Sequence, residues 1–245
     1  PAAHDEVRPV EVSAPAACPR YLGRVIRNVD LSKPTPLWMV ERLRRSDVRS
    51  IDAAVDITNY VMLELGQPLH AFDNTQLDGA VHARMATAGE KILLLNEQTL
   101  ELSDDVLLIA DDKRPLAMAG IMGGEDTGIT LDTTEMFLES AFFAPKAIAG
   151  RARRYGFGSD ASHRFERGVD FGSTRNALER ASQLILDICG GQAGPLCAAD
   201  AALPARNPVR LRPARAAKVL GVAFSAEEIG NLFARLDLPF TRDGE

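Results

Sequence analysis

Two polar side chains lie among apolar or turn-forming residues, where a carboxylate and an imidazole would be placed to take part in chemistry. Glu139 interrupts MFLESAFF (136–143), an otherwise apolar run typical of a strand, and this position would aim its carboxylate into a closed site. His70 follows Gln67-Pro68 and is expected in a turn just after a helix. On the residues alone, Glu139 is equally consistent with an ion pair at a strand end, and a lone histidine is more often a structural hydrogen-bonder than a catalyst.

Established catalytic signatures are absent from the sequence. The Gly-rich segment AMAGIMGGEDTG (117–128) lacks the GxxxxGKS or GxxxxGKT pattern of a phosphate-binding loop, and neither HExxH nor GxSxG occurs. The four histidines are scattered along the chain, so we expect no metal site. The three cysteines form no CxxC pair and are odd in number, which predicts free thiols in the cytoplasm at Cys18, Cys189 and Cys197.

Charge and hydropathy limit the class of protein. The net charge of -6 over 245 residues argues against a free-standing nucleic-acid binder that acts by bulk attraction. Arginines cluster at 42–49 and 151–167, although such runs are more often solvated faces than binding sites. No apolar run approaches the roughly 20 residues that span a bilayer, and no basic start precedes an apolar stretch. We therefore expect no membrane segment and no signal peptide.

The elements expected to position these residues follow from periodicity and capping signals. Residues 1–17 are rich in proline and alanine and are expected to be a lead-in linker. Apolar residues at helical spacing predict a helix that begins at Thr35-Pro36, a helix at 51–65 with a stop at Gly66, and a helix from Ser173 or Thr174 to Gly190. Alternating or short apolar runs predict strands at 20–30, 81–86, 106–110 and 136–143, and a hairpin at 91–102 around Asn96-Glu97.

The composition shifts at 201–207, which predicts a linker before a second domain. Beyond it, VRLR (209–212) is expected to be a short strand and 213–220 a helix that ends at Gly221. Ser225 and Glu228 form a capping-box pattern for a last helix. The chain is therefore predicted to be α+β, a mixed or antiparallel sheet with packed helices over 18–200, followed at 207–245 by the start of a small α/β domain.

Four long blocks resemble consecutive blocks of the beta chains of bacterial phenylalanyl-tRNA synthetases, in matching order and spacing. They are RSIDAAVDITNYVMLELGQPLHAFD (49–73), LAMAGIMGGEDTG (116–128), FLESAFFAP (137–145) and RARRYGFGSDASHRFERGVD (151–170). The resemblance covers almost all of 18–197 and is specific to the editing domain of that family. It implies hydrolysis of the ester between a wrongly attached tyrosine and the terminal adenosine of the tRNA.

The resemblance also implies which residues line the editing pocket. Carried over position by position, they are Thr58, Asn59, His70, Gly123, Glu139, Ser159 and Ala161. Glu139 would pair with the tyrosine hydroxyl, and Thr58, Asn59 and His70 would hold or orient the attacking water. Gly123 and Ala161 would be small to leave room for the amino acid. Ser159 stands where the family often has threonine.

The resemblance further implies the partners of the complete enzyme. These are an alpha subunit in an alpha2beta2 assembly, the acceptor end of tRNA(Phe), and ATP and magnesium for aminoacylation, with no cofactor in this segment. The arginines at 151–154 and 164–167 would either steer the tRNA through phosphate contacts or pair internally with acids such as Glu166 and Asp170. A non-catalytic structural or tRNA-binding module of the same subunit is the alternative function.

Overall fold

A computed structural model describes residues 2–243, which divide into two units. The first unit ends at Leu203 and the second begins at Pro204. The first unit contains the sheets and the residues expected to form the site, whereas the second contains two helices.

Two sheets form the centre of the first unit. In the four-stranded antiparallel sheet the order is β11-β2-β10-β3; its strands are β2 (Arg20–Arg27), β3 (His70–Asp73), β10 (Glu135–Phe142) and β11 (Gln192–Asp200). In the five-stranded sheet the order is β1-β4-β7-β8-β9; its strands are β1 (Val10–Val12), β4 (Val81–Met85), β7 (Leu107–Ala110), β8 (Pro115–Met118) and β9 (Met122–Gly123). The predicted hairpin is confirmed as β5 (Lys91–Leu93) and β6 (Thr99–Glu101).

The helices follow the local signals of the sequence. They are α1 (Leu37–Arg45), α2 (Ala53–Leu65), α3 (Pro145–Ile148), α4 (Arg151–Arg154), α5 (Asp160–Phe165), α6 (Thr174–Cys189), α7 (Pro213–Leu220) and α8 (Ala226–Arg235), with short 3-10 turns η1 (Asn74–Gln76) and η2 (Glu125–Thr127). Helix α2 begins where the Asp52 carboxylate accepts from the Val55 amide and ends at Gly66, which adopts the left-handed conformation. The capping box of Ser225 and Glu228 at α8 is also confirmed.

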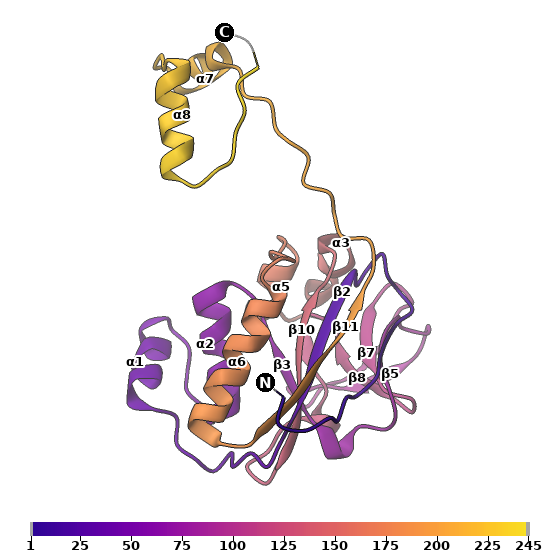
Figure 1. Ribbon diagram of the computed structural model, residues 1–245. Coiled ribbons are helices and arrows are strands. Elements are labelled where there is room, and N and C mark those ends of the chain that lie inside the picture. Colours follow the sequence, from indigo (N-terminus) through magenta and orange to yellow (C-terminus); the bar gives the residue numbers. More distant parts are fainter. Residues whose placement is uncertain (1, 244–245) are drawn as a thin grey trace. The chain divides into compact units, whose positions relative to one another are not determined.

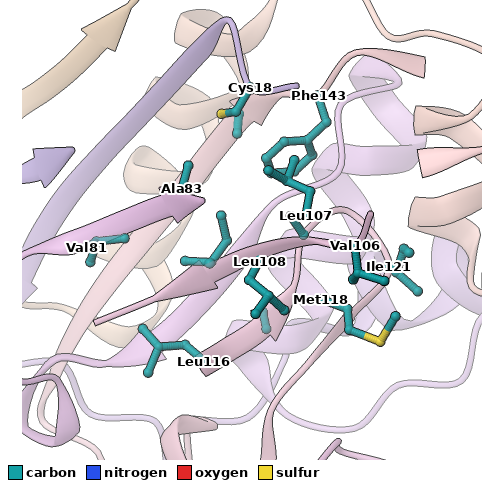
Figure 2. Close-up of a cluster of buried hydrophobic side chains, with 14 of the residues drawn as sticks. Cys18, Val81, Ala83, Val106, Leu107, Leu108, Leu116, Met118, Ile121 and Phe143 are labelled. Carbon is teal, nitrogen blue, oxygen red and sulfur yellow. The ribbon is translucent and has the colours of Figure 1, made fainter. Parts of the chain in front are cut away.

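The four-stranded sheet is the middle layer of the first unit. Helices α1, α2 and α6 cover one of its faces, and the five-stranded sheet lies on the other side (Figure 1). Because side chains alternate along a strand, β10 sends Met136 and Leu138 into the helix-packed core, and Phe137 and Ala141 into the core between the sheets. Figure 2 shows part of this second core, where Leu107, Leu108 and Met118 come from β7 and β8.

Four local expectations were wrong, and one strand was missed. His70 was expected in a turn but is the first residue of strand β3. The lead-in contributes β1, which pairs in parallel with β4. The Gly-rich segment is not a loop but the β8–β9 hairpin followed by η2. Strand β11 was not expected at all. It contains Pro195, which the structure accommodates at a register shift between Ala193 and Leu196. VRLR (209–212) has no strand partner and is irregular.

Candidate functional site

Glu139 lies at the centre of the four-stranded sheet. On β10 it is opposite Gly23 of β2 and opposite His70 of β3. Directly opposed residues project to the same face, so the carboxylate and the imidazole both point toward the five-stranded sheet. Glu139 is only 6% exposed, and its Oε2 accepts a 2.6 Å hydrogen bond from the Tyr21 hydroxyl.

The electrostatics of Glu139 are set by burial. Removal from water disfavours the ionised carboxylate and raises its pKa from 4.5 to about 7, while the Tyr21 hydrogen bond acts in the opposite direction. Burial and the neighbouring carboxylate also raise the pKa of Tyr21 well above its ordinary value. Tyr21 therefore remains a protonated donor at neutral pH. Because its pKa lies at about 7, Glu139 changes its charge state near neutral pH.

His70 is an uncharged imidazole at neutral pH. Burial lowers its pKa from 6.5 to about 4. Its ring stands edge-on to Phe72, with centroids 4.5 Å apart. Its Nε2 is buried and has no hydrogen-bond partner among the described residues. A bound molecule or water would satisfy this atom, and a neutral imidazole can either accept or donate a hydrogen bond.

A cavity of about 70 Å³ lies beside these two residues. It brings together four of the seven expected site residues, which come from four different elements: His70 from β3, Gly123 from β9, Glu139 from β10 and Ala161 from α5. The remaining lining is apolar side chains and backbone, from Pro68, Leu69, Ile109, Ala117, Met118, Ala119, Gly120, Ile121, Met122 and Phe165. The geometry thus offers one carboxyl and one imidazole to a ligand held by apolar contacts.

Gly123 is small because the His70 ring packs directly against it. A Cβ at this position would lie 2.5 Å from His70 Cε1 and 2.8 Å from Nε2, and the next atom met would be Leu95 Cδ1 at 3.1 Å. A side chain here would thus displace the imidazole before it filled the cavity. Gly123 acts on the site through the position of His70.

Ser159, Thr58 and Asn59 do not line this cavity. Ser159 caps α5, and its hydroxyl donates to the carbonyl of Ile121 at 2.6 Å, so it ties α5 to the β8–β9 hairpin. Thr58 and Asn59 are half-buried on α2, whose apolar residues pack in the helix-covered core, and the Thr58 hydroxyl donates to the Val55 carbonyl. Of these three, Ser159 touches a residue that does line the cavity.

Comparison with known proteins identifies the family of the chain. The family model described as the B3/4 domain matches residues 17–190, most of the chain. The chain belongs to the B3/4 domain family. The phenylalanine–tRNA ligase beta subunit of Dechloromonas aromatica is 69% identical over 238 residues, 97% of this chain and 30% of that protein. The Pseudomonas putida beta subunit is 62% identical over 247 residues, 100% of this chain and 31% of that protein.

The resemblance to synthetase beta chains is therefore confirmed, and the chain spans about 30% of the length of these relatives. A solved N-terminal fragment of the phenylalanyl-tRNA synthetase beta subunit from Pyrococcus horikoshii is 14% identical with a TM-score of 0.47, covering 96% of this chain and 67% of that fragment. That score is too low to bear on the fold.

Several residues at or beside the cavity were not predicted from the sequence. Tyr21, Met118 and Phe165 are the main ones, since the first contacts Glu139 and the other two line the cavity. Their local patterns are those of ordinary core positions. Only the strand register and the docking of α5 bring them to the site.

The arginine clusters of the B3/4 domain are largely paired with acids. The Asp105 carboxylate forms ion pairs with both Arg151 and Arg154. The hydrogen bond from Arg154 holds the pKa of the Asp105 carboxyl well below its usual range. Arg164 pairs with Asp160, and Arg167 pairs with the expected Glu166. Within residues 2–243 no group of three histidine, cysteine or acidic side chains is placed to hold a metal. No helix in that range is long and apolar enough to cross a membrane.

Proposed function

We propose that this B3/4 domain hydrolyses the ester of tRNA(Phe) that carries tyrosine in place of phenylalanine. The observation that carries the proposal is the buried Glu139 carboxyl beside an otherwise apolar cavity. A tyrosine hydroxyl would hydrogen-bond to its free oxygen Oε1, whereas phenylalanine would leave that oxygen without a partner at a cost of about 1–3 kcal/mol. Such a site is needed because an apolar synthetic pocket rejects an added hydroxyl by only about a hundredfold.

The chemistry assigned to the cavity is direct attack by water. Among the described residues that line it there is no serine, threonine, cysteine or lysine to form a covalent intermediate. His70 is neutral at pH 7, and its unpartnered Nε2 is suited to orient the water or the terminal ribose. Thr58 and Asn59 lie off the cavity, so their share in holding this water is inferred from the resemblance alone.

The size of the cavity indicates that its lining adjusts when an aromatic amino acid binds. Its volume of about 70 Å³ is roughly half of the ~150 Å³ apolar cavity that accommodates benzene. Met118 and Met122 line it, and methionine side chains rearrange easily because they are unbranched and flexible. We infer that these two side chains move aside to admit the tyrosine ring.

The complete enzyme supplies the context for this hydrolysis. We infer that the domain works within an alpha2beta2 phenylalanine–tRNA ligase of the cytoplasm, whose other parts use ATP and magnesium to charge tRNA(Phe). Arg153 on α4 is exposed and lies beside the paired Arg151 and Arg154, which supports a contact with a phosphate of the acceptor end.

Substitution of the two polar residues in the complete enzyme tests the proposal. Glu139→Ala and His70→Ala are expected to impair clearance of tyrosyl-tRNA(Phe) and to leave phenylalanine charging nearly intact, since the hydrolytic cavity is separate from the synthetic site. Deacylation of purified tyrosyl-tRNA(Phe) and phenylalanine charging are measured side by side. Unchanged deacylation in both variants would favour a non-catalytic structural or tRNA-binding module instead.

A further inference from the structure

Tyr21 does not line the cavity, but it contacts the site through its hydrogen bond to Glu139. Its hydroxyl is the sole side-chain hydrogen-bond partner that the described residues give to the Glu139 carboxylate. The donor–acceptor distance is 2.6 Å, and Tyr21 is fully buried. A phenol has one hydrogen to donate, so Tyr21 engages Oε2 and leaves Oε1 for another donor.

The sheet holds Tyr21 rigidly in this position. Tyr21 is opposite Ala141 on β10, and the next residue of β2 on the same face is Gly23, opposite Glu139. Because Gly23 has no side chain, the phenol can reach diagonally across to the carboxylate. The Phe137 ring occupies the space where a Cβ of Gly23 would lie. The tyrosine ring is packed in the core between the sheets, so its donor is fixed in direction.

We propose that Tyr21 is a positioning residue for amino-acid selection, which clamps Oε2 of Glu139 so that Oε1 faces the cavity and receives the hydroxyl of a bound tyrosine. This inference rests on the proposed function of the cavity. Tyr21 touches neither the ester nor the water; it acts through Glu139. The role predicts an effect on discrimination between tyrosine and phenylalanine that exceeds any effect on hydrolysis itself.

Burial is the largest influence on the pKa of Glu139, and among the surrounding titratable groups Tyr21 is the one that opposes it. His70 on β3 is neutral near pH 7 because its pKa lies at about 4. Burial raises the pKa of Cys18, which precedes β2, and of Cys197 on β11, so both thiols are uncharged. Within the part of the chain that the structure describes, no cation opposes the effect of burial on the carboxyl, whereas the Tyr21 hydrogen bond does. Removal of that hydroxyl should therefore raise the pKa of Glu139 further.

The decisive measurement is the pH profile of deacylation by the complete enzyme carrying Tyr21→Phe. The ratio of kcat/KM for tyrosyl-tRNA(Phe) over phenylalanyl-tRNA(Phe) should fall by roughly tenfold, which corresponds to loss of one hydrogen bond to a charged group. The rise of tyrosyl-tRNA hydrolysis with pH should move to higher pH, because ionised Glu139 accepts the stronger hydrogen bond. Hydrolysis of phenylalanyl-tRNA(Phe) should keep its pH profile.

Ser140→Ala is the matched control for the loss of a buried hydroxyl. Ser140 is the next residue of β10, is equally buried, and donates to the Thr174 carbonyl at 2.9 Å on the opposite face of the sheet. This variant should keep both the selectivity ratio and the pH profile. If Ser140→Ala shifts them as far as Tyr21→Phe does, the effect is one of packing and the proposal fails.

A second variant tests the role of Tyr21 even if Tyr21→Phe misfolds. Site-specific 3-fluorotyrosine at position 21 keeps the shape of the ring and makes the phenol a stronger donor, so the pH profile should move to lower pH. A profile unchanged by fluorination would overturn the proposal. In Glu139→Gln enzyme, where position 139 carries no ionisable group, neither change at position 21 should shift the profile.

Failure of this inference is distinguishable from failure of the proposed function. If the unsubstituted enzyme does not deacylate tyrosyl-tRNA(Phe), the function itself is wrong. If it does so and Tyr21→Phe retains both selectivity and pH profile, the cavity edits without the clamp, and only the role of Tyr21 is overturned.

Discussion

The two faces of strand β10 differ in what they give the molecule. Toward the helices, Met136 and Leu138 are fully buried in a continuous apolar core, and the Ser140 hydroxyl is satisfied by a backbone carbonyl. Toward the second sheet, Glu139 lies next to a cavity with a single buried hydrogen bond to Tyr21. The face toward the helices stabilises the strand. This stability offsets the unfavourable burial of the Glu139 carboxyl on the other face.

The largest expected effect contrasts two neighbouring residues on these faces. Leu138→Ala removes packing on the helix side and should lower the free energy of unfolding by about 2–5 kcal/mol. Glu139→Gln keeps an acceptor for Tyr21 and removes a buried ionisable group, so at pH 7 it should change stability by less than about 1 kcal/mol. Urea denaturation of both variants measures the contrast. Comparable losses would mean that the two faces stabilise the strand equally.

The next effect concerns the opposite titrations of Glu139 and His70. The folded pKa of Glu139 is raised from 4.5 to about 7, so its contribution to stability is complete below pH 4.5 and is lost as pH rises through 7. The folded pKa of His70 is lowered from 6.5 to about 4, so its contribution is complete above pH 6.5 and is lost as pH falls through 4. Between pH 4.5 and 6.5 the two contributions oppose each other.

Single substitutions should separate these titrations. Relative to the unsubstituted protein, Glu139→Gln should lose stability as pH falls from 6.5 to 4.5, by roughly 3 kcal/mol, because His70 then acts alone. His70→Gln should lose stability as pH rises over the same window. Unfolding free energies measured at several pH values give the differences. Parallel pH profiles for all three proteins would show that these groups keep ordinary pKa values when folded.

A smaller effect is expected at the contact between Gly123 and His70. Gly123→Ala places a methyl group 2.5 Å from His70 Cε1, so the ring must shift, at a cost of about 1–3 kcal/mol of stability. Tyrosyl-tRNA hydrolysis should fall with it, because the imidazole is displaced. Ala161→Gly, at the other wall of the cavity, is the control that adds no atoms. Thermal melting and deacylation are measured for both variants. Full activity of Gly123→Ala would contradict the inference that the His70 ring is displaced.

The smallest stability effect is expected on the helix side, at Asn59. This half-buried residue makes no side-chain hydrogen bond in the described part of the chain, so Asn59→Ala should alter stability by no more than about 0.5 kcal/mol. From the role that the resemblance implies, we expect a fall in tyrosyl-tRNA hydrolysis smaller than that of Glu139→Ala. Deacylation equal to that of the unsubstituted enzyme would remove Asn59 from the mechanism.

The sequence by itself determined the elements whose signals are local. Helix α2 ends at Gly66 as predicted, α8 begins at the Ser225 capping box, and the β5–β6 hairpin turns where expected. Capping bonds and short turns join residues a few positions apart, so their information lies within a short window of sequence. The resemblance added the identity of residues that line the cavity, including His70 and Glu139.

Tertiary structure alone decided the arrangement that could make these residues a site. Strand β1 forms because it pairs with β4, about seventy positions away, and β11 forms despite Pro195 because β2 supplies its partner. The Tyr21–Glu139 hydrogen bond joins residues 118 positions apart. Pairing of distant strands depends on register and on burial of a whole face, which no local pattern encodes. For the same reason the pKa of Glu139 follows from the sheet packed over it, not from the strand on which it lies.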